Sequence, residues 1–165
     1  SWLMPPTGPL PERIAEVKTG LAARWEPLVD KEDGDALQRV LTYEPVQAPP
    51  TPLLTMMFAG YRRRGLETPE LQTAPIRDPI GGRIWIFNFD VRLWVDLVSD
   101  EEAAQRRTDA LVPVVVAALE EDPSLGSLAV DSAMSSGDTH IMSPQQGQAL
   151  LIHTCKCSVE IEESV

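Results

Sequence analysis

The sequence predicts an α+β protein, a mainly antiparallel β-sheet with two helices packed on one face. Residues 84–98 alternate between two faces with a period of two, which indicates a long half-buried strand. Residues 11–25 and 99–121 instead place apolar side chains at helical spacing. The expected order is helix, two strands, long loop, strand, helix and two strands. The length of 165 residues favours a single domain over 1–165.

Composition limits the classes of partner. Hydrophobic residues make up 43%, enough for a core, and 25 acidic against 14 basic residues give a formal charge of −11. A protein that grips DNA needs a basic face, so we expect DNA to pass nearby without specific binding. No apolar run or leader pattern indicates a membrane or a signal peptide. Cys155 and Cys157 are expected to be reduced thiols.

The first half begins with a helix over 11–25, with Pro11 at its first helical position. Its apolar stripe should face the sheet. Strands are predicted over 37–43 and 53–58, with a proline-rich extended segment, 45–52, between them. The stripe comprises Ile14, Val17, Leu21 and Trp25 and continues to Leu28.

Two segments are expected to extend from the domain. Residues 1–9 form a predicted N-terminal arm, and 60–82 form a long polar loop or arm between the second and third strands. A connection this long in a small domain is normally functional or flexible. It carries the only basic cluster, Arg62, Arg63 and Arg64, which either contacts an acidic neighbour or DNA, or is a solvated loop tip.

The strand over 84–98 is long for the domain. Fifteen extended residues span roughly 50 Å, whereas a compact domain of this size is about 40 Å across. The strand must therefore bend, bulge or protrude, and a protruding strand usually meets another chain. Trp85, Phe87 and Phe89 are expected to hold the sheet on the helices. On the opposite face, Arg92 and Trp94 are candidate contacts, although a second layer of the same protein could equally cover Trp94.

The second half begins with a helix capped by Ser99 and Glu102, with an ion pair from Glu102 to Arg106. Pro113 predicts a kink, and the helix should end before Pro123. A strand over 128–134, a polar connection over 135–147 and a last strand over 148–161 complete the chain. The last strand matches the aromatic strand in length, so the two could be neighbours.

Few residues suggest chemistry. His153, Cys155 and Cys157 line one strand face and cannot converge on a tetrahedral ion without a bend, while His140 lies in a polar segment. Asp90 and Asp96 are about 20 Å apart in an extended strand, too far for acid–base partnership. Phosphate-cradling and nucleophile-elbow motifs are absent from the sequence. We therefore expect no enzyme activity, no cofactor and no metal.

The helix sequence over 100–111 and its exit, Asp122-Pro123-Ser124-Leu125-Gly126-Ser127, follow a long strand and precede a hairpin. In this order the chain resembles the tail terminator and tail-completion proteins of long-tailed bacteriophages. The resemblance implies a structural virion protein, assembled in the host cytoplasm, that forms a ring, usually a hexamer. That ring would sit at the head-proximal end of the tail tube, terminate tail growth and join the head-completion or connector protein, with genomic DNA passing through its lumen.

Alternatives remain at this point. The chain could be another ring subunit of the same machine, either a tail-tube or a head-completion protein. It could also be a small hydrolase or ligand-binding domain that uses His140 or His153, or an acidic adaptor that binds through Arg62–Arg64. The candidate interface residues are Arg62, Arg63, Arg64, Arg92 and Trp94.

Overall fold

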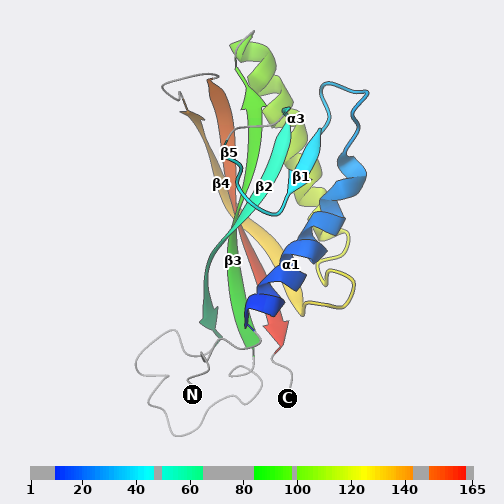
Figure 1. Cartoon of the computed structure of the whole chain (residues 1–165), viewed down its shortest axis with the longest axis vertical. Coiled ribbons are helices and arrows are strands. Elements are labelled where there is room, and N and C mark those ends of the chain that lie inside the picture. Colours follow the sequence, from blue (N-terminus) through cyan, green and yellow to red (C-terminus); the bar gives the residue numbers. More distant parts are fainter. Residues whose placement is uncertain (1–9, 47–49, 65–83, 98–99, 143–148, 163–165) are drawn as a thin grey trace, which may run out of the picture.

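One five-stranded mixed sheet and two α-helices make up the computed structural model, which describes residues 10–46, 50–64, 84–97, 100–142 and 149–162 (Figure 1). The predicted α+β class is confirmed. Strand order across the sheet is β1-β2-β3-β5-β4. The elements are α1 (Leu10–Trp25), the 3-10 helix η1 (Glu26–Leu28), β1 (Arg39–Leu41), β2 (Leu53–Arg63), β3 (Ile84–Asp96), α3 (Glu101–Glu120), β4 (Asp131–Met142) and β5 (Leu150–Glu162).

The aromatic strand β3 is the centre of the sheet. It pairs antiparallel with β2 on one side and with β5 on the other. Every residue of β3 has a partner in β5, so the predicted neighbour relation between the two long strands is confirmed. At 13 residues each, β3 and β5 are about 43 Å long. Only β1 runs parallel to its neighbour, over the first three residues of β2.

Both helices pack on the same face of this sheet (Figure 1). The odd-numbered residues of β3 point to this face, and Phe87 and Phe89 are almost completely buried in the main core. Trp85 is partly buried at its edge. The helices contribute Val17, Leu21 and Trp25 from α1, and Ala104, Val115, Ala118 and Leu119 from α3.

A second, smaller core lies on the opposite face, where neither of the described helices packs and which we call the helix-free face. The segment that follows β1 covers part of this face. Glu44 in that segment forms an ion pair with Arg92 of β3, and Thr51 Oγ1 accepts a hydrogen bond from the backbone N–H of Asp96 at 3.3 Å. The members of this second core are Leu41, Leu53, Trp94, Leu150 and Ile152.

Helix α3 begins one residue later than predicted. Its N-cap is Asp100, whose side chain accepts hydrogen bonds from the N–H groups of Glu102 and Ala103, so the prediction of a Ser99 capping box is wrong. The predicted ion pair from Glu102 to Arg106 is confirmed at 3.0 Å. The helix continues through Pro113 to Glu120.

Two strands are longer than predicted. β2 continues to Arg63 and β4 to Met142, so residues 60–63 and 135–142 are strand where loop was expected. Each strand contains a register shift, between Phe58 and Gly60 in β2 and between Met134 and Ser136 in β4. An extra residue interrupts the two-residue alternation that marks a strand in sequence. The predicted N-terminal arm and the remainder of the predicted loop lie outside the described residues.

Candidate assembly interface

The outer side of β4 is an exposed sheet edge. β4 is the last strand in the order, and in the described part of the chain no strand pairs with its outer side. Ten of its twelve residues are exposed, and its sequence contains neither lysine nor proline. Proteins usually protect a long sheet edge with such residues, because open backbone N–H and C=O groups invite another strand. This edge is therefore a candidate site for strand addition.

The opposite edge is open over part of its length. β1 covers only Leu53–Thr55 of β2, and no other described strand pairs with residues 56–63 on that side. Met57 and Tyr61 in this stretch are 39% and 51% exposed. In the part of the chain that the structure describes, the sheet thus has two open edges, on opposite sides of one subunit.

Exposed apolar side chains gather on these edges. Four of the eight large hydrophobic residues exposed in the described ranges belong to β2 and β4. Burial of such side chains against another chain removes apolar area from water, which favours association. The four are Met57, Tyr61, Ile141 and Met142.

The predicted arginine cluster lies at the end of the β2 edge. Arg62 and Arg63 belong to the strand, and the backbone N–H of Arg64 still donates to Ile84 O at 2.9 Å. Since side chains alternate along a strand, Arg62 and Arg63 point to opposite faces of the sheet. Arg63 packs over the ring of Trp85, with Cζ 4.4 Å from the ring centroid. The three arginines therefore do not act as one loop-tip cluster.

Arg92 and Trp94 make their contacts within the subunit. Arg92 pairs with Glu44 and lies 3.6 Å from Asp90, which also receives Lys156 Nζ at 2.7 Å. These charges form a continuous row across three segments on the helix-free face.

Trp94 is only 7% exposed and belongs to the second core, where its Nε1 donates to Thr55 Oγ1 at 2.9 Å. Of the two predicted interpretations, coverage by the same chain is the one observed, and the interpretation of Trp94 as an exposed anchor is wrong.

The two cysteines and His153 lie on the helix-side face of β5. Burial raises the pKa of the Cys155 thiol, and burial together with neighbouring Cys155 raises the pKa of Cys157 to about 12. His153 Nδ1 lies 2.7 Å from Thr139 Oγ1, and burial lowers the pKa of its imidazole. In the described ranges, no group of three or more His, Cys, Asp and Glu side chains is placed to hold a metal ion.

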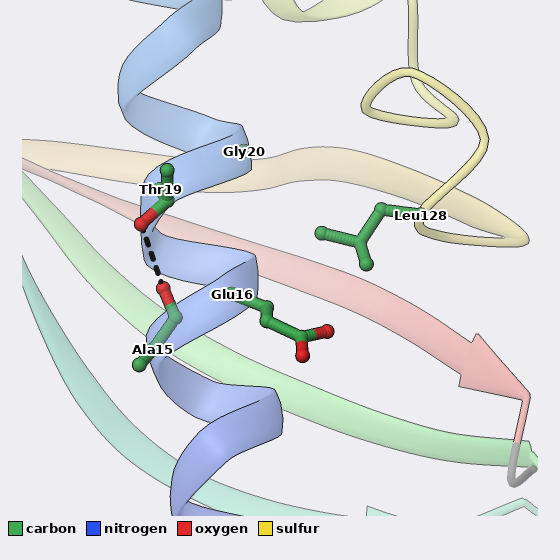
Figure 2. A pocket seen from close by; sticks show the side chains of 5 residues that line it. All are labelled: Ala15, Glu16, Thr19, Gly20 and Leu128. Carbon is green, nitrogen blue, oxygen red and sulfur yellow. Dashed lines mark hydrogen bonds between the residues drawn. The ribbon is translucent and has the colours of Figure 1, made fainter.

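Figure 2 shows a shallow hollow beside α1. It is lined by residues of α1, of which Glu16 and Gly20 lie on the side toward Leu128, and Leu128 itself belongs to the segment after α3. The Thr19 hydroxyl donates to Ala15 O at 3.0 Å, so it is used within the helix. Among the described residues of the lining, Glu16 is the only charged one, and these residues do not present converging polar groups that would orient a ligand.

No protein-family model matches the chain, and a search of curated proteins finds no match. Among the described helices, none is both long and apolar enough to span a membrane.

Proposed function

We propose that this chain is a structural ring subunit at the head-proximal end of a long bacteriophage tail. The ring, most simply a hexamer, stops the growth of the tail tube and joins the tail to the head-completion or connector protein. The observation that carries this proposal is the pair of open sheet edges on opposite sides of one subunit. The resemblance of residues 84–127 to tail terminator and tail-completion proteins supplies the setting.

Two different complementary surfaces on one subunit support a closed ring. A contact between unlike surfaces is heterologous, so each copy still offers one edge after it has bound with the other. Repetition of that contact gives a closed ring when the rotation closes. A contact between like edges would instead stop at a dimer.

The charge of the helix-free face supports passage of DNA. Acidic residues outnumber basic ones there, and a wall of this sign repels phosphate, so DNA in contact with it would not adhere. This face is therefore a suitable wall for the lumen. Its acidic members are Glu44, Asp90, Asp96, Asp131, Asp138, Glu160 and Glu162, and its basic members are Arg39, Arg62, Arg92 and Lys156.

The closest alternative is another ring subunit of the same machine, either a tail-tube or a head-completion protein. Such a subunit would use the same open edges, so the edges do not distinguish it from a terminator. The position of the ring on the tail distinguishes the two functions.

The test is to mix the purified protein with tail-tube subunits from the same genome and to image the product by electron microscopy. A terminator caps one end of each tube and limits tube length. Incorporation along the tube, or longer tubes, would contradict termination and favour a tube subunit. An Ala133→Lys variant, which adds charge to an exposed position of the β4 edge, should cap poorly, whereas Gln105→Lys on the exposed side of α3 should cap normally.

A further inference from the structure

We propose that neighbouring copies join by antiparallel pairing of β4 in one copy with β2 in the next, with residues 131–137 opposite residues 56–62. This inference rests on the proposed function, which supplies the closed ring. It adds to that function the strand that each open edge binds in the neighbouring copy. The result would be one continuous sheet running through all subunits.

Strand direction is compatible with this pairing. β2, β3, β5 and β4 alternate in direction across the sheet, so β4 runs opposite to β2 within one subunit. A head-to-tail ring keeps these directions in every copy when its axis runs along the strands. β4 therefore meets the next β2 in the antiparallel sense, with the same ladder geometry as the neighbouring pairs.

The rows of the sheet show which residues of the two edges lie at the same level, and the proposed register joins residues of equal level. Asp131 pairs with Glu160, Glu160 with Ile86 and Ile86 with Arg62, so Asp131 and Arg62 mark the same level on opposite edges. By the same route Gly137 is level with Met56, the first residue of β2 beyond the cover of β1.

The two bulges compensate at this register. β2 contains one extra residue at Ala59, and β4 contains one extra residue at Ser135. Because both strands gain a residue between the same two end rows, 131–137 and 56–62 oppose each other residue for residue. A bulge usually interrupts edge pairing. Here each of the two strands contains one extra residue, so the two paired segments have the same number of residues.

Side chains near both ends of the paired segment fit this register. Asp131 would lie opposite Arg62 on the helix-free face, and opposite charges across a strand pair are stabilising. Met57, 39% exposed in the single chain, would lie opposite Ser136 on the same face and lose contact with water.

Cysteine cross-linking tests the register directly. In the Met57→Cys/Ser136→Cys variant, mild oxidation or a short bis-maleimide should link copies into a ladder of bands up to the ring size, in solution or on tail tubes. Each single-cysteine variant should give no ladder, since two Met57 positions or two Ser136 positions never meet in a head-to-tail ring. The native cysteines are buried, and the single variants also measure their background.

A charge swap provides the second readout. Asp131→Arg should raise the protein concentration needed for assembly at least tenfold. The double variant Arg62→Asp/Asp131→Arg should return this concentration to the wild-type value. Cross-linked dimers from Ser136→Cys alone would show contact between two β4 edges and overturn the proposal. Folded protein that gives no ladder on tubes would also overturn it, even if the tubes are capped. Rings that cross-link as expected but do not cap tubes would contradict the terminator function alone.

Discussion

The guanidinium of Arg24, near the end of α1, donates two hydrogen bonds to the carbonyl oxygen of Ala118 in the last turn of α3, from Nε at 3.2 Å and Nη2 at 3.1 Å. The last carbonyls of a helix lack intrahelical partners, and a cation there also complements the helix dipole. Trp25 Nε1 adds a bond to Val115 O at 3.0 Å. Arg24 and Trp25, which are adjacent in α1, thereby hold the C-terminal end of α3 against α1.

Replacement of Arg24 should destabilise the fold. We expect Arg24→Met to lower the free energy of unfolding by about 1–2 kcal/mol, because it removes a charged donor from a helix terminus. Urea unfolding measures this loss. Arg106→Met is the matched control, since its ion pair with Glu102 is exposed and should contribute less than about 0.5 kcal/mol. Equal losses in the two variants would contradict a capping role for Arg24.

The bond from Trp94 to Thr55 should show energetic coupling. The Thr55 side chain is 0% exposed, so Trp94→Phe leaves a buried hydroxyl without its donor, at a cost of about 1–3 kcal/mol. Thr55→Val removes the other partner. In a double-mutant cycle followed by urea unfolding, the two losses should not add, because the second substitution has no bond left to break.

Acid should weaken the loop after α3. Asp122 accepts from the Ser124 hydroxyl at 2.6 Å and from the Gly126 N–H at 2.8 Å, and these bonds lower the pKa of its carboxyl. A lowered carboxyl pKa gives stability that is present above the unfolded value of 3.8 and lost as pH falls through the folded value. Asp122→Asn should therefore show a smaller loss of stability at acid pH than the wild type. A parallel acid dependence in both proteins would contradict this.

Periodicity identified the elements that carry apolar faces. The stripe from Val17 to Trp25 and the alternation through Phe87 and Phe89 predict α1 and β3 correctly, since burial of one face forces the repeat. Residues 135–142 escaped prediction. They form an edge strand with both faces exposed, so packing imposes no alternation of apolar and polar residues.

The candidate interface was only partly predictable, because local sequence patterns do not reveal bulges or contacts between distant segments. Arg62 and Arg63 look like a loop cluster in sequence because the bulge at Ala59 disrupts the pattern before them. Coverage of Trp94 depends on a segment that is distant in sequence, which local pattern does not reveal. The open edges themselves follow from strand order, and strand order is set by long-range pairing.

Gly137 should not tolerate a side chain. A Cβ at this position would lie 2.6 Å from His153 Nε2 and 3.2 Å from Thr154 O, so Gly137→Ala should lower stability by about 1–3 kcal/mol. Gly34→Ala is the control, because a Cβ there has no heavy atom within 4 Å. Addition of His153→Ala to Gly137→Ala should recover part of the loss. Equal stability of the two alanine variants, measured by thermal unfolding, would contradict the clash.

Protonation of His153 should destabilise the fold below neutral pH. Burial lowers the pKa of this imidazole below 6.5, with Asp138 and Asp109 opposing the shift, so the unfolded chain binds the proton more tightly. Stability from this group is thus fully present above pH 6.5 and is lost as pH falls toward the folded value. In His140→Gln, His153 is the remaining imidazole of the two in the chain, and its NMR titration should have a midpoint below 6.5. His153→Gln should flatten the stability profile in this interval; a midpoint above 6.5 would reverse the expected sign.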